Sequence, residues 1–144
     1  MTDARHRRFD LAIVAGLSAA LAIGLAIRPS FEEGGVVLRL FGVQLPATCW
    51  FRLVTGLPCA GCGMTRAVVL ALHGEPRAAR QAHPFALPLL GLGGLQLILR
   101  AASLAGWTGP GLTWADRAFV GALTTFLVAM LAWWVLQLAR GFLP

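Results

Sequence analysis

The residues best suited to chemistry in this 144-residue chain lie close together, in the segment TGLPCAGCGMTRA at positions 55–67. Cys59 and Cys62 are separated by two residues, and Thr65 and Arg66 follow at once. A Cys-x-x-Cys pair can form a redox-active disulfide, contribute two thiolates to a metal site, or tighten a loop as a structural disulfide. The spacing of the two cysteines leaves all three uses open.

In a redox pair, Cys59 would attack and Cys62 would resolve the mixed disulfide. A helix N-terminus and a nearby cation lower the pKa of a thiol, and both are predicted beside Cys59 because an apolar helical run begins just after it. Cys49 could serve as a third, shuttling thiol. The strand–helix pattern of thioredoxin-like proteins does not surround the pair, however, which argues against a thioredoxin-type fold.

In a metal site, the cysteine pair would need two further ligands. Only Cys49, His73 and His83 are plausible suppliers in the sequence. His73 closes a predicted helix, where a cation favours the C-terminal dipole, and His83 precedes a proline, so both also have ordinary structural interpretations. The candidate metal ligands are Cys49, Cys59, Cys62 and His83, and zinc is the ion that such a set would hold.

Arginine and glycine suggest a third chemistry for the same segment. Gly61 and Gly63 permit backbone conformations that turn successive N–H groups toward one point, and Thr65 and Arg66 add a hydroxyl group and a guanidinium. An arginine at mid-bilayer costs about 2.5–3.5 kcal/mol on insertion scales, which an anionic lipid headgroup, an acidic partner or the interface would offset. These four residues therefore form a candidate anion site.

The composition places these residues in a membrane protein. Hydrophobic residues make up 58% of the chain and charged residues only 12%, with a mean hydropathy of +0.74, whereas a soluble domain has about a quarter charged residues. The twelve basic residues are all arginine and are scattered, not gathered on one face with aromatics, which argues against nucleic-acid binding. We expect a single domain over residues 1–144, in contact with the lipid bilayer.

Apolar segments predict the helices that position the cysteines. We expect spans at about 11–27, 85–105 and 117–139, and a short or re-entrant helix at 60–73 directly after the cysteine pair. Residues 28–58 are more polar and rich in glycine and proline, which predicts an interfacial loop that could include a short strand or an amphipathic turn. The predicted fold class is all-α, a small polytopic membrane helical bundle of about four helices.

The distribution of arginines predicts an orientation in the membrane. With four spans, both termini and a polar turn at 74–84 lie on one side, which then carries six of the twelve arginines. Cytoplasmic loops carry the excess of basic residues in membrane proteins. The N-terminus is therefore predicted to be cytoplasmic, and the end of the short helix that carries Cys59 is predicted to face outward, where conditions are oxidising.

The segment CWFRLVTGLPCAGCGMTRAVVLALHGEPRAARQAHPF, residues 49–85, resembles the signature of the domain of unknown function 2752 family, which consists of small bacterial membrane proteins. Members typically show a cysteine, a Thr-Gly-x-Pro-Cys-Pro-x-Cys-Gly-x-Thr-Arg-Ala core, and a later Asn-Pro or His-Pro. This chain departs at Ala60, where proline is usual, and at Glu75, where aspartate is common. The resemblance implies a multi-span protein of the bacterial inner membrane, and it implies no activity.

Three functions are compatible with these residues. We favour a non-enzymatic membrane protein whose cysteine turn, held by a disulfide or a metal, shapes a surface for another membrane protein. The alternatives are a membrane thiol–disulfide component that uses Cys59 and Cys62, and recognition of an anionic headgroup through Arg66. No nucleophile–base pair, paired carboxylates or nucleotide-binding loop is evident in the sequence, so no enzymatic activity is assigned.

Overall fold

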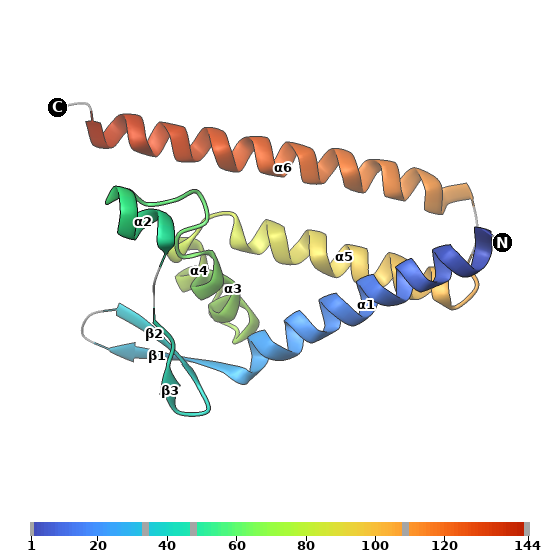
Figure 1. The fold of residues 1–144 in the computed structure, drawn as a ribbon, viewed down its shortest axis with the longest axis horizontal. Helices are drawn as coiled ribbons and strands as arrows, with labels where there is room; N and C mark the ends of the chain where they lie inside the picture. Colours follow the sequence, from blue (N-terminus) through green and yellow to red (C-terminus); the bar gives the residue numbers. More distant parts are fainter. Residues whose placement is uncertain (1, 33–34, 47–48, 108–109, 143–144) are drawn as a thin grey trace.

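The computed structural model describes residues 2–32, 35–46, 49–107 and 110–142. Long helices run along the molecule, and a small sheet and three short helices gather at one end (Figure 1). In chain order the elements are α1 (Thr2–Ala26), β1 (Ile27–Glu32), β2 (Gly35–Leu40), β3 (Val43–Gln44), α2 (Trp50–Thr55), α3 (Met64–Leu72), α4 (Pro76–Ala82), α5 (Ala86–Leu104) and α6 (Pro110–Phe142).

Three of these helices are long and apolar enough to cross a membrane. They contain the segments His6–Ala26 of α1, Ala86–Leu104 of α5 and Trp114–Gly141 of α6, which correspond to three of the segments predicted as spans. The short helix expected at 60–73 is present as α3, but its nine residues extend only about 14 Å at 1.5 Å per residue. The structure thus indicates a membrane protein with three long helices and a shorter α3.

The predicted all-α class is wrong in one respect, because residues 27–44 form a three-stranded antiparallel sheet. Strand β1 pairs with β2 from Ile27↔Leu40 to Glu32↔Gly35, and β2 pairs with the two-residue β3. Phe41 and Gly42 connect β2 to β3, and both have positive φ angles, 49° and 85°. Such a two-residue turn matches the twist of the strands that it joins, so the segment folds into hairpins instead of an irregular loop.

Residues 64–82 form a helical hairpin that brings the chain back to the cysteine end. The turn predicted at 74–84 contains α4, which begins at Pro76, a residue whose fixed φ suits the first helical position. Ala67 and Leu70 of α3 pack against Ala79 of α4 and Ala86 of α5, and all four side chains are fully buried. Alanine at three of these positions allows the helices to approach closely.

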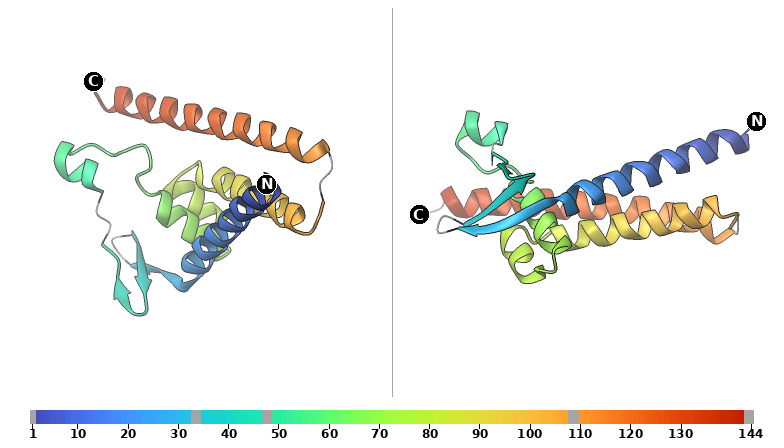
Figure 2. Two further views of the ribbon diagram at one scale, coloured as in Figure 1. Left: turned by 45° about the vertical axis from the view of Figure 1, so that its right-hand side comes forward. Right: turned by 90° about the horizontal axis from the view of Figure 1, so that it is seen from below.

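Polar contacts join the long helices to their neighbours at both ends of the molecule. At one end, Arg100 of α5 donates to Asp10 of α1 at 3.0 Å and to Asp116 of α6 at 2.7 Å. At the other end, Trp134 Nε1 donates to the carbonyl oxygen of Pro58 at 2.7 Å. The sheet, α2, α3 and the C-terminal part of α6 lie at this second end, opposite the N-terminus (Figure 2). The sequence predicted that the turn at 74–84 lies on the same side as the N-terminus. In the structure it lies at the opposite end (Figure 2).

Candidate functional site

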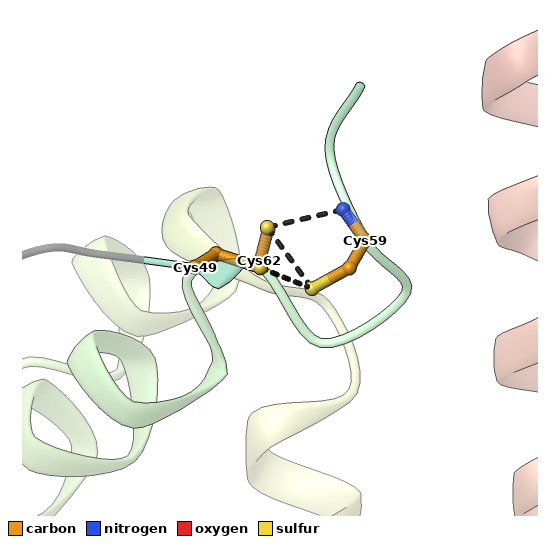
Figure 3. Close-up of side chains that lie close together, drawn as sticks. All are labelled: Cys49, Cys59 and Cys62. Atoms are coloured by element: carbon orange, nitrogen blue, oxygen red, sulfur yellow. Dashed lines mark hydrogen bonds between the residues drawn. The ribbon is translucent and has the colours of Figure 1, made fainter. Parts of the chain in front are cut away.

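The structure brings all three cysteines of the chain together (Figure 3). Cys49 immediately precedes α2, whereas Cys59 and Cys62 belong to the loop between α2 and α3. The Sγ atom of Cys59 lies 3.3 Å from that of Cys49 and 3.0 Å from that of Cys62, and the three Sγ atoms are within 4.8 Å of one another. All three are free thiols. We call this group the cysteine cluster.

Two features of the backbone bring the cysteine cluster together. Helix α2 ends at Gly56 in the left-handed conformation, with φ at 72°, which reverses the chain after a helix of six residues. The loop then folds tightly, because the N–H of Cys62 donates to the carbonyl oxygen of Cys59 at 3.1 Å and the N–H of Cys59 donates to Cys62 Sγ at 3.1 Å. The two cysteines thus face each other across one turn.

Gly63 fixes this loop against the helical hairpin. Its φ angle is +90°, and a Cβ at this position would lie 2.9 Å from the carbonyl oxygen of Ala82 at the end of α4. Both the conformation and the close approach require glycine. Gly61 has open space around its Cα instead, so only one of the two glycines beside Cys62 is restricted in this way.

The thiols of the cysteine cluster differ in acidity. The backbone N–H of Arg52 in α2, followed by the side chains of Cys59 and Cys62, lowers the pKa of Cys49 to about 7. Burial, followed by hydrogen bonding to the other two thiols, raises the pKa of Cys59 to about 11. The low pKa that the sequence predicted for Cys59 is therefore found at Cys49, whose thiolate forms before that of Cys59.

A pocket of about 810 Å³ adjoins the cysteine cluster. All four residues of the predicted anion site line it, namely Gly61, Gly63, Thr65 and Arg66, together with the three cysteines. The structure adds Arg52, which the sequence analysis did not single out. Its position one helical turn after Cys49 is the signal that could have identified it, since residues three apart share a helix face.

Comparison with known proteins identifies this part of the chain. Residues 49–97 match the model of a family described as "Protein of unknown function (DUF2752)". This segment belongs to the DUF2752 family. It contains the cysteine cluster and both pocket arginines, and it overlaps the segment 49–85 in which the sequence showed the resemblance to this family. No curated protein and no solved structure matches the chain.

The cysteine cluster in the DUF2752 segment has the composition of a three-thiolate metal site. Soft thiolate ligands select ions such as zinc, which binds sulfur at about 2.3 Å. Three Sγ atoms within 4.8 Å of one another can surround one such ion after small shifts. Among the described residues, no fourth histidine, cysteine, aspartate or glutamate joins them. A four-coordinate structural zinc site would therefore need one further ligand from outside these residues.

His83, the fourth ligand predicted from the sequence, has another role in the DUF2752 segment. Its side chain is 1% exposed, its Nε2 donates to the carbonyl oxygen of Ala60 at 2.9 Å, and its Nδ1 accepts from the N–H of Phe85 at 3.3 Å. Because both ring nitrogens are engaged, neither lone pair is available to a metal. His83 instead ties the cysteine loop to the start of α5, and Trp133 of α6 packs against its ring at 5.4 Å.

The hydrogen bonds of His73 are made within α3 and do not involve the cysteine cluster. Its Nδ1 donates to the carbonyl oxygen of Val69, one turn earlier in α3, at 2.9 Å. The backbone N–H of His73 reaches carbonyl oxygens of the same turn. His73 therefore caps the C-terminus of α3, which is the structural interpretation that the sequence offered.

The arrangement of the sulfurs is less suited to thiol–disulfide exchange. In an exchange step, the Cys49 thiolate would attack the Cys59 sulfur of a Cys59–Cys62 disulfide, form the Cys49–Cys59 bond and release the Cys62 thiolate. Such an attack needs the three sulfurs nearly in line. Because all three lie within 4.8 Å, the angle at Cys59 Sγ is close to a right angle or smaller. This compact triangle suits a shared ion better than a relay.

A second polar cluster, which the sequence analysis missed, joins the three long helices at the other end of the molecule. Arg100 pairs with Asp10 and Asp116, and the hydroxyl of Ser103 donates to Asp10 at 2.8 Å. The side chain of Gln96 lies beside the guanidinium and, with its amide reversed, accepts from Arg100 Nε at 2.9 Å. Charged residues inside apolar runs are the signal that could have found it, since each needs a partner in a membrane.

Proposed function

We propose that this chain is a non-enzymatic protein of the bacterial cytoplasmic membrane whose cysteine cluster binds one zinc ion. The observation that carries the proposal is the meeting of three sulfurs, from two segments ten residues apart, within 4.8 Å. The ion would hold the start of α2 to the loop before α3. It would thereby shape the surface that the DUF2752 segment presents to lipid or to another membrane protein.

Three considerations favour zinc over a structural disulfide. A disulfide uses two sulfurs and leaves the third without a role, whereas zinc employs all three. The pKa of about 7 at Cys49 supplies a thiolate at neutral pH, and metal binding would release the proton of Cys59. The cluster also joins the start of α2 to the loop before α3, and structural zinc sites hold together separate segments of small domains in this way.

The distribution of arginines supports a cytoplasmic location for the cysteine cluster. Seven of the twelve arginines belong to segments at the cluster end of the molecule: Arg28, Arg39, Arg52, Arg66, Arg77, Arg80 and Arg140. The other five belong to segments at the opposite end: Arg5, Arg7, Arg8, Arg100 and Arg117. By the positive-inside rule, the cluster faces the cytoplasm and the N-terminus lies outside. This reverses the orientation predicted from the sequence, and it places the thiols in a reducing compartment.

The experiment that tests the zinc site is a paired metal and thiol analysis. The protein is purified in mild detergent without reductant, zinc is measured by mass spectrometry, and thiols are titrated before and after chelation. We expect one zinc per chain, and three titratable thiols only after chelation. Cys49→Ser, Cys59→Ser and Cys62→Ser should each lose the ion, whereas the control His73→Gln, at a residue bonded within α3, should retain it.

The same measurement tests the redox alternative, which the lowered pKa of Cys49 favours. A protein without metal and with one titratable thiol would contain a disulfide between two of the three cysteines. The zinc proposal would then be wrong. The reduction potential of that disulfide would decide between a structural bond and an exchanging pair.

A further inference from the structure

We propose that the pocket beside the cysteine cluster binds the phosphate group of an anionic phospholipid. The inference rests on the proposed membrane location, but it does not require the metal. The charged side chains that line the pocket are Arg52 of α2 and Arg66 of α3, and no carboxylate is among its described lining residues. The ion pairs found in the described part of the chain involve Arg39 and Arg100, and neither pocket arginine takes part in them.

Two arginines from different helices therefore converge on one space without an acidic partner in the described structure. Guanidinium groups bind phosphate through paired N–H donors, and they are the preferred cations for such planar, bidentate contacts. The hydroxyl of Thr65, which also lines the pocket, offers a further donor. An anion in this position would offset the charge of both arginines.

Part of the pocket lining is apolar. Besides the polar Gln44, it includes Val36 and Leu38 of β2 and Leu45 and Pro46 just beyond β3, and Val36, Leu38 and Leu45 are half-buried. A small inorganic anion would leave these apolar residues without contacts. A ligand that joins an anionic group to hydrocarbon would fill both parts of the pocket, which is the chemistry of an anionic lipid.

The position of the pocket along the long helices also fits a lipid headgroup. Pro58 lines the pocket, and its carbonyl oxygen accepts from Trp134, which lies in the C-terminal part of the membrane-length segment of α6. Tryptophan is enriched at the membrane–water interface. Trp50 of α2 is 79% exposed near the same site, where it would contact the interface. With these tryptophans at the interface, the pocket would lie close to lipid phosphates.

Lipid titration of the detergent-purified protein tests this proposal. Phosphatidylglycerol, phosphatidylcholine and inorganic phosphate are titrated separately, and binding is followed by native mass spectrometry and by tryptophan fluorescence. We expect saturable binding of phosphatidylglycerol, at least tenfold tighter than that of the other two probes. Arg66→Gln and Arg52→Gln should each weaken it about tenfold. The control Arg140→Gln removes an exposed charge from the same end of the molecule and should leave the affinity unchanged.

Each other outcome overturns a defined part of the proposal. Equal binding of phosphatidylglycerol and phosphatidylcholine would exclude selection for an anionic lipid. Tight, arginine-dependent binding of inorganic phosphate would identify the ligand as a free anion. The side chain of Arg52 is exposed, so its replacement removes no buried contact. Unchanged lipid affinity in Arg52→Gln would therefore exclude the pocket as the site.

Zinc content, measured on the same samples, separates this inference from the proposed function. Lipid binding by a zinc-free wild-type protein would support the lipid site and contradict the metal site. Zinc retained in Arg66→Gln with unaltered lipid affinity would contradict the lipid site alone.

Discussion

Replacement of Arg100 by methionine is expected to destabilise the packing of the three long helices by about 3–5 kcal/mol. Arg100 donates to Asp10 at 3.0 Å, and the two side chains are only 14% and 8% exposed. Loss of the cation leaves a buried carboxylate without its partner, which costs about 3–5 kcal/mol. Asp116 is 37% exposed, so the loss of its ion pair is screened and adds at most about 1 kcal/mol.

Reversible unfolding by sodium dodecyl sulfate in mixed micelles, followed by far-ultraviolet circular dichroism, measures this free energy. The double variant Asp10→Asn/Arg100→Met removes the carboxylate charge together with the cation. It should therefore be more stable than Arg100→Met alone by at least about 1 kcal/mol, because no buried charge is left unpaired. Two results would refute the reasoning: an unfolding free energy of Arg100→Met within about 1 kcal/mol of the wild type, or a double variant no more stable than the single one.

Three further predictions concern the cysteine loop. In metal-free protein, the thiolate fraction of Cys49 should rise through half near pH 7 while Cys59 stays protonated until about pH 11; alkylation rates across pH, read by mass spectrometry, check this, and equal rates for both thiols would contradict it. His83→Ala should lower the free energy of unfolding by about 2–4 kcal/mol, because it leaves a cavity at a buried position. The variant should still bind one zinc per chain. Loss of zinc from the folded variant would show that His83 is a ligand. Gly63→Ala should lower the free energy of unfolding by about 1–3 kcal/mol, because alanine is strained at positive φ. Gly61→Ala should stay within about 1 kcal/mol of the wild type. Similar unfolding free energies for the two variants would contradict this prediction.

The long helices could be predicted from the sequence because hydropathy is a local property. The spans expected at 11–27, 85–105 and 117–139 coincide closely with the membrane-length segments of α1, α5 and α6. The sequence could not separate a thin span from a packed helix at 60–73, however. An apolar run of this length fits both, and only the burial of Ala67 and Leu70 against neighbouring helices shows that α3 packs within the protein.

The sheet and α4 were missed because their signals are weak. In residues 27–44, the alternation of apolar and polar side chains is interrupted, and the hairpins depend on positive φ angles at Phe41 and Gly42 that no sequence pattern requires. Helix α4 is seven residues long and contains two arginines, so it resembles a polar turn. Counting 60–73 as a fourth span mattered most, because that count placed 74–84 at the end of the molecule that carries the N-terminus.

The candidate site was predicted in part. The spacing of Cys59 and Cys62 indicated a thiol pair, and the structure places the Cys49 thiol beside them. His83 was predicted as a ligand, but its two ring nitrogens bond to the backbone of Ala60 and Phe85 instead. The bond to Ala60 joins residues 23 positions apart, which the sequence alone does not reveal. Arg52 was missed because its place beside the pocket depends on the reversal of the chain after α2.

X-ray absorption at the zinc edge of the detergent-purified protein tests the central claim most directly. The account predicts a first coordination shell of three sulfurs at about 2.3 Å and one lighter atom, oxygen or nitrogen. The cysteine cluster supplies the sulfurs, and the lighter atom would come from a ligand outside the cluster. A first shell of nitrogen and oxygen alone, or a protein that contains no zinc, would contradict the account.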